Sequence, residues 1–138
     1  MPPQVPVVLV INSSQELVTV LAQALEQAGL LAVTMLSHQI RNGAVDVEAF
    51  VRQHQPCVVT YDIAPPYDAD YALFRHIRQF PALSGCRFVL TSPNVHHLKT
   101  LLPPDELPHV HEIIGKPHDL GEYVGAVLQA VRKSTGAS

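Results

Sequence analysis

The sequence alternates short apolar runs with amphipathic stretches, and this alternation limits the possible folds more than any other feature. The apolar runs are continuous and rich in β-branched residues, which is typical of strands buried on both faces of a parallel sheet. The stretches between them carry apolar residues at helical spacing. The pattern predicts an α/β fold with a doubly wound parallel sheet. Its five strands are predicted at residues 5–11, 31–36, 57–61, 87–91 and 110–114.

Five helices are predicted to alternate with these strands. Ser13 is predicted to cap the first helix, because Glu16 follows three residues later as in a capping box. Its buried face is predicted to comprise Leu17, Leu21, Ala24, Leu25 and Ala28. The other helices are predicted within residues 47–54, 68–80, 94–102 and 120–131. The last of them is predicted to bury Leu120, Val124, Val127, Leu128 and Val131. Arg41-Asn42-Gly43 is predicted to form a turn.

Composition favours one soluble domain. The chain has 138 residues, of which 47% are hydrophobic, enough for a single core. We expect one domain over residues 1–133 and a frayed tail over residues 134–138. A net charge of −3 without a basic run argues against nucleic-acid binding.

Sequence signals for secretion and membrane insertion are weak. No Lys or Arg precedes Arg41, so the N-terminus lacks the basic segment of a signal peptide. No apolar run approaches the ~18 residues that a membrane span needs. Two cysteines are too few for a disulfide framework. We therefore expect a cytoplasmic protein without membrane contact.

Polar residues follow four of the predicted strands. Asn12-Ser13 follow the first, Asp62 ends the third, Thr91 ends the fourth, and Lys116 follows the fifth. The carboxyl ends of parallel strands meet at one edge of a sheet, where open α/β sheets bind ligands. We therefore expect a carboxylate, a hydroxyl and an ammonium group to converge there.

These residues resemble the receiver domain of two-component response regulators. The resemblance covers residues 7–132 and rests on Asp62 with Pro66 four residues later, on Leu90-Thr91, and on Lys116-Pro117. It implies a (βα)5 flavodoxin-like sheet with strand order 2-1-3-4-5.

The resemblance also implies a chemistry. Asp62 would accept a phosphoryl group from a phosphohistidine, with Thr91 and Lys116 holding phosphoryl oxygens. The bond before Pro117 would be a candidate for the cis form. Implied partners are a histidine kinase or a downstream signalling protein, and a homodimer through the last two helices is a further option. The expected role is signalling and not catalysis.

The chain departs from the receiver pattern at the end of the first strand. Receivers carry two acidic residues there, which hold Mg2+ together with the phosphoacceptor, whereas this chain has Asn12 and Ser13. Mg2+ prefers carboxylate oxygens, so no cofactor is expected beyond weakly bound Mg2+. With those charges gone, we predict a direct Asp62–Lys116 ion pair. Ile113 replaces the aromatic residue usual on the fifth strand.

Three functions remain open. The first is a stand-alone, atypical receiver that acts mainly through protein–protein interaction. The second is a working phosphoacceptor, since Asp62, Thr91 and Lys116 are all retained. The third is an enzyme or small-ligand binder that uses the same edge of the sheet, which only the general rule on strand ends supports.

Histidines and cysteines suggest two lesser hypotheses. His96-His97 and the pair His109 and His111 lack a standard set of metal ligands, so no metal site is predicted. Cys57 and Cys86 each lie five residues before the polar residue of their own strand. They are expected to lie near each other as reduced thiols, with a redox pair as the alternative.

Overall fold

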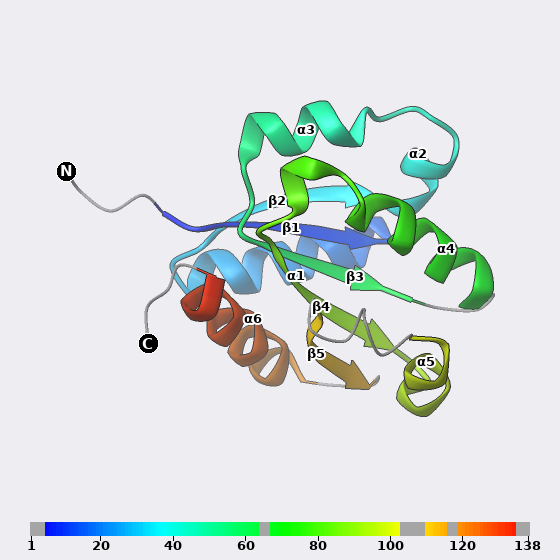
Figure 1. The fold of residues 1–138 in the computed structure, drawn as a ribbon. Helices are drawn as coiled ribbons and strands as arrows, with labels where there is room; N and C mark the ends of the chain where they lie inside the picture. The colour runs from blue at the N-terminus through cyan, green and yellow to red at the C-terminus, as the bar shows by residue number, and fades with distance from the viewer. Residues whose placement is uncertain (1–4, 64–66, 103–109, 116–118, 135–138) are drawn as a thin grey trace.

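The chain folds into a five-stranded parallel sheet covered by helices on both faces (Figure 1). The computed structural model describes residues 5–63, 67–102, 110–115 and 119–134. The strands are β1 (Val7–Asn12), β2 (Leu31–Leu36), β3 (Val58–Asp62), β4 (Arg87–Ser92) and β5 (Val110–Gly115). The helices are α1 (Gln15–Gln27), α2 (Ser37–Arg41), α3 (Val47–His54), α4 (Tyr67–Arg78), α5 (Val95–Leu101) and α6 (Leu120–Ser134), with a 3-10 turn η1 (Pro81–Leu83).

The strand order is β2-β1-β3-β4-β5, and every pair of neighbours is parallel. This order confirms the predicted doubly wound, flavodoxin-like fold. The central strands β1, β3 and β4 are almost fully buried. Burial on both faces explains why their sequences are continuous apolar runs.

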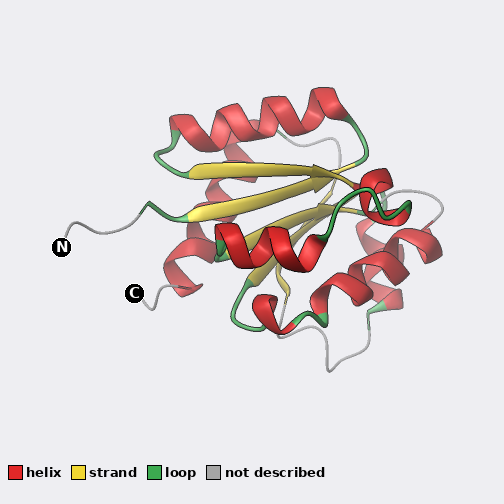
Figure 2. Cartoon of the chain, turned by 90° about the horizontal axis from the view of Figure 1, so that it is seen from above, coloured by secondary structure: helices red, strands yellow, loops and turns green. Residues whose placement is uncertain are grey.

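Two hydrophobic cores lie on opposite faces of the sheet. One core lies under α3, α4 and α5 and is built around residues such as Val51, Phe74 and Leu98. The other lies under α1 and α6 and includes Leu25 and Val127. Figure 1 shows α1 and α6 next to each other on one side of the sheet, and Figure 2 gives the perpendicular view. No helix among the described residues is long and apolar enough to cross a membrane.

The first helix begins one residue later than predicted. β1 runs from Val7 through Asn12, so the chain leaves the sheet only after Asn12. The Asn12 side chain then accepts the backbone N–H of Ser14 at 3.2 Å. Ser14 is the N-cap and accepts from Leu17 N at 3.2 Å, whereas Ser13 is exposed. The predicted Ser13 cap is therefore wrong.

The buried faces of the first and last helices are rotated from their predicted positions. Leu17 is 38% exposed, and α1 instead buries Val18, Leu21 and Leu25. Leu120 is 44% exposed. The buried positions of α6 are Tyr123, Ala126, Val127, Ala130 and Val131. A tyrosine and two alanines thus replace most of the branched residues expected there.

The segment after β2 contains a helix that the sequence did not predict. Ser37–Arg41 form α2, which ends at Asn42, and Gly43 follows with a positive φ of 74°. The predicted turn is present at Asn42 and Gly43, whereas Arg41 is the last residue of α2. The helical segment contains only Ile40 as an apolar residue, so it has no hydrophobic periodicity. The predicted alternation of five helices with five strands therefore lacked α2.

Candidate functional site

Asp62 and Thr91 form a hydrogen-bonded pair at the carboxyl edge of the sheet. Asp62 ends β3, and the β3–β4 register places Thr91 directly opposite it. The Thr91 hydroxyl donates to Asp62 Oδ1 at 2.7 Å, and each residue is 6% exposed. A short bond to a carboxylate in a buried setting fixes both side chains. The carboxylate and the hydroxyl are thus brought together, as the polar residues at the ends of the strands led us to expect.

Asn12 lies at the end of the neighbouring strand. It follows Ile11, which pairs with Tyr61 of β3, so Asn12 lies one position beyond this pair on the same edge as Asp62. Its side chain is buried and its amide oxygen accepts from Ser14 N. Ser13 points into solvent. The end of β1 therefore supplies one neutral amide to the edge and no charge.

Three residues of the sequence motif lie outside the described residues. They are Pro66, Lys116 and Pro117. The Asp62–Lys116 ion pair and the cis bond before Pro117 therefore stay predictions. Ile113, at the position of the usual aromatic residue, is half-buried in β5 and packs against the core under α3 and α4.

The donor set at the edge fits Mg2+ poorly. A hard cation of this kind is held by one or more carboxylates together with waters, and charge from several carboxylates raises its affinity. Asp62 supplies a carboxylate, one oxygen of which is engaged by Thr91. The Asn12 oxygen is engaged by Ser14. Among the described ranges, no group of three His, Cys, Asp or Glu residues could hold a metal ion.

An ion pair lies near Tyr61, on the face of the sheet covered by α3 and α4. Arg41 at the end of α2 pairs with Asp70 in the first turns of α4, and the Asp70 side chain is 9% exposed. Tyr61 lies in the same region, and its hydroxyl has no hydrogen-bond partner among the described residues. Burial raises the pKa of Tyr61, while the charge of Arg41 acts in the opposite direction and that of Asp62 adds to the rise. The phenol therefore stays protonated between these opposite charges.

A buried pair of hydroxyl groups lies on the face of β3 that α1 and α6 cover, opposite the face of Tyr61. The Tyr123 hydroxyl of α6 and Thr60 Oγ1 are 2.8 Å apart. Tyr123 is fully buried and Thr60 is 2% exposed. Burial raises the pKa of Tyr123, and the hydrogen bond with Thr60 partly offsets the rise. Helix α6 is thus joined by a polar contact to the strand that carries Asp62.

Cys57 and Cys86 lie at the opposite end of the sheet and are both free thiols. Each cysteine immediately precedes its strand, and Val58 of β3 pairs with Arg87 of β4, so the two cysteines precede neighbouring strands at the same level. Cys57 packs against the core under α1 and α6, whereas Cys86 packs against the core under α3 and α4. Cys86 Sγ donates to Pro56 O at 2.9 Å. The two cysteines therefore lie next to neighbouring strands, but their side chains pack against different cores.

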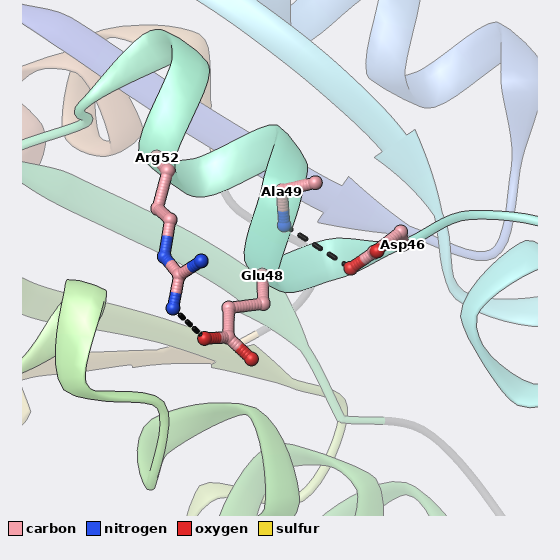
Figure 3. Close-up of polar contacts among 4 residues, drawn as sticks. All are labelled: Asp46, Glu48, Ala49 and Arg52. Atoms are coloured by element: carbon pink, nitrogen blue, oxygen red, sulfur yellow. Dashed lines mark hydrogen bonds and ion pairs between the residues drawn. The ribbon is translucent and has the colours of Figure 1, made fainter.

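A surface hollow of about 360 Å³ also lies at the amino end of β3. It is lined by Val51, Arg52, Gln55, Pro56 and Ala82. Arg52 is paired with Glu48 one turn earlier in α3, as Figure 3 shows. The hollow therefore lies at the opposite end of β3 from Asp62, and Arg52, the cation among its described lining residues, is paired with Glu48.

Sequence reasoning missed several residues of the edge. Thr60 could have been found, because it lies two positions before Asp62 and must face the same side of the sheet. The Arg41–Asp70 pair gave no signal, because the two residues are distant in sequence and α2 was not predicted.

Comparison with known proteins identifies the fold. No protein-family model and no curated protein matches the chain. Among solved structures, a CheY-like receiver domain from Methanospirillum hungatei JF-1 is similar, with a TM-score of 0.73 and 12% identity over 98% of this chain and 100% of the other. A sensor protein from Polaromonas sp. JS666 has a TM-score of 0.71 and 19% identity, covering 96% and 99%. A CheY-like receiver domain from Methylobacillus flagellatus has a TM-score of 0.67 and 20% identity, covering 93% and 99%.

Proposed function

We propose that this chain is an atypical receiver domain of two-component signalling, which acts mainly through contacts with other proteins and has weak or no Mg2+-dependent phosphorylation. One observation carries the proposal. Asp62 is buried at the carboxyl edge of β3 and bonded to Thr91, while the end of β1 offers Asn12 and Ser13 in place of carboxylates. The acceptor and its hydroxyl are present, and the usual metal ligands are not.

The missing carboxylates affect phosphoryl transfer directly. In this reaction an Asp62 oxygen would attack the phosphorus of a phosphohistidine, the P–N bond would break, and the imidazole would leave and take up a proton. Charge on the equatorial oxygens must be neutralised as the bond breaks. Asn12 offers no charge with which to hold a cation for that purpose. Transfer is therefore expected to be slow.

The alternative function is a working phosphoacceptor. The Asp62–Thr91 bond of 2.7 Å favours it, because the hydroxyl is already placed to donate to an oxygen on Asp62. After transfer it would donate to a phosphoryl oxygen instead. In this reading Lys116 would supply the charge that the end of β1 lacks.

Mass spectrometry after incubation with acetyl phosphate or phosphoramidate separates the two functions. The wild-type chain is expected to gain little phosphoryl mass with or without Mg2+. The double variant Asn12→Asp/Ser13→Asp restores two carboxylates and is expected to gain one phosphoryl group only when Mg2+ is present. Asp62→Asn in the same background should abolish the gain, which shows that the group is on Asp62.

Full labelling of the wild-type chain would overturn the preferred reading. If Asp62→Asn also removed that labelling, the chain would be a working phosphoacceptor. A lack of labelling in both the wild-type chain and the double variant would argue against a receiver site at this edge.

Sedimentation velocity over a range of concentrations tests the homodimer through α5 and α6. A sedimentation coefficient that stays at the monomer value over the whole range would exclude the dimer.

A further inference from the structure

Tyr123 is a buried polar residue in a helix face that otherwise holds small and apolar side chains. Its neighbours in the core under α1 and α6 include Val8, Val58 and Val127. A buried hydroxyl without a partner costs free energy, so a phenylalanine would fill the same space without that cost. Tyr123 meets the cost through its 2.8 Å hydrogen bond with Thr60. Packing alone therefore does not explain why a tyrosine, and not a phenylalanine, occupies this position.

The position of Thr60 provides that reason. Side chains at alternate positions of a strand lie on the same face, so Thr60 and Asp62 share one face of β3. In the neighbouring strand, Val89 is opposite Thr60 and Thr91 is opposite Asp62. Two buried polar pairs thus lie on successive steps of the same face, with Tyr123–Thr60 directly behind Asp62–Thr91. A change in charge or position at Asp62 would act first on this neighbour.

The Tyr123–Thr60 bond links helix α6 directly to β3. Apolar packing against β3 and β4 holds the helix in place but allows small shifts, whereas a buried hydrogen bond is short and directional. Through this bond, a displacement of the strand that carries Asp62 would act on α6 at Tyr123. The Tyr123 hydroxyl belongs to a helix. On β5, the position at which receivers usually carry an aromatic residue is occupied by Ile113.

We propose that Tyr123 is a positioning residue that couples the state of Asp62 to helix α6 through its hydrogen bond with Thr60. The use of this coupling in signalling rests on the proposed function, but the coupling itself does not require phosphorylation. Any change of charge at Asp62, including Asp62→Asn, should alter the Tyr123 environment. This independence allows the two proposals to fail separately.

Fluorine NMR provides the test. The chain has four tyrosines, at positions 61, 67, 71 and 123, so labelling with 3-fluorotyrosine gives four resonances. Tyr123→Phe assigns the resonance of interest, and the fluorine beside the hydroxyl reports on its hydrogen bond. Asp62→Asn is expected to shift the Tyr123 resonance. In Thr60→Val that shift should fall to less than half, while Thr60→Ser, which keeps a hydroxyl, should retain it.

A matched control is Thr34→Val, which makes the same change at an exposed position of the edge strand β2. It should leave the response of Tyr123 to Asp62→Asn unchanged. The proposal is overturned if Asp62→Asn does not move the Tyr123 resonance, or if the shift is equally large in Thr60→Val. A merely structural role would lower stability in Thr60→Val without changing the response to Asp62.

Hydrogen exchange over residues 120–134 gives a second measurement if Thr60→Val does not fold. Asp62→Asn is expected to change exchange in α6, and Tyr123→Phe should remove that difference. An equal difference in Tyr123→Phe would overturn the coupling. If Asp62 is never phosphorylated but Asp62→Asn still shifts Tyr123, the phosphoacceptor function fails and the coupling stands. If Asp62 is labelled and Tyr123 does not respond, the coupling fails and the phosphoacceptor function stands.

Discussion

The Thr91 hydroxyl donates a 2.7 Å hydrogen bond to Asp62 Oδ1 between neighbouring strands β4 and β3. Thr91→Val keeps the side-chain shape and removes the donor, which leaves a buried carboxylate with one bond fewer. We expect a loss of about 1.5–3 kcal/mol in the free energy of unfolding, the range for hydrogen bonds to charged groups. Urea unfolding followed by circular dichroism measures this loss.

Two variants control for the loss of a hydroxyl. Thr91→Ser keeps the donor and should recover most of the stability. Thr34→Val makes the same chemical change on the exposed face of β2 and should alter stability by less than about 0.5 kcal/mol. Equal effects of the valine substitution at positions 91 and 34 would show that the Asp62 bond contributes nothing.

The Arg41–Asp70 pair joins α2 to the start of α4, and Asp70 is the buried partner. Arg41→Ala leaves the buried carboxylate without this cation, which costs more than the loss of an exposed ion pair. Because the Arg41 side chain is 43% exposed, solvent screens part of the effect. We expect a loss of about 1–3 kcal/mol, measured by chemical unfolding at low and at high salt.

The Arg52–Glu48 pair provides the matched control for Arg41. Both of its side chains are substantially exposed on one face of α3 (Figure 3). Arg52→Ala should therefore cost no more than about 0.5 kcal/mol, with most of that lost at high salt. A larger effect of Arg52→Ala than of Arg41→Ala would contradict the assignment of Arg41 as a structural link between α2 and α4.

The α3 helix begins at an aspartate cap. Asp46 accepts a hydrogen bond from Ala49 N at 3.1 Å (Figure 3). Asp46→Ala should destabilise the protein by about 1 kcal/mol, because it leaves a helix N–H without its partner. Asp46→Asn retains an acceptor oxygen and should cost a few tenths of that. A thermal melt of the three proteins in parallel would detect the difference, and equal melting temperatures would rule out a role for the cap.

The fold could be predicted from the sequence because its central strands β1, β3 and β4 are buried on both faces. The runs at residues 5–11 and 57–61 are mainly apolar, and such runs have few alternatives once helical stretches separate them. Convergence at the carboxyl edge then follows from parallel topology alone, which is why Asp62 and Thr91 could be placed on one edge. Their hydrogen bond also needs the register, which no local pattern determines.

Two kinds of feature could not be predicted. They are the exact residue at which an element begins or ends, and contacts between residues that are distant in sequence. Asn12 is polar, so it was assigned to a loop, but its side chain supports the turn while its backbone completes β1. That offset of one residue moved the helix cap from Ser13 to Ser14. On α6, the exposed Leu120 was preferred to the buried Tyr123 because leucine is the more hydrophobic residue. The buried tyrosine can be justified only when its partner on β3 is known.

Cys86 is the residue whose chemistry depends most clearly on pH. Burial, with a smaller contribution from Cys57, raises the pKa of its thiol from the ordinary value of 9.0 to about 12. Because the thiolate is the reactive form, alkylation by iodoacetamide at pH 8 should be slower in the folded protein than in urea by roughly a thousandfold, a factor of ten for each pH unit of the shift. Peptide mass spectrometry of the alkylated protein measures the rate at Cys86 separately from that at Cys57.

The raised pKa of Cys86 also makes the free energy of unfolding depend on pH in the alkaline range. The folded state holds the Cys86 proton more tightly than the unfolded state, so this contribution is fully present below about pH 9 and is lost as the pH rises towards 12. Burial also raises the pKa of Tyr123, which acts in the same direction, so the comparison must be made between variants. Cys86→Ala should flatten the decline in unfolding free energy above pH 9. If the wild-type and Cys86→Ala curves remain parallel through that range, the Cys86 thiol does not contribute to the alkaline loss.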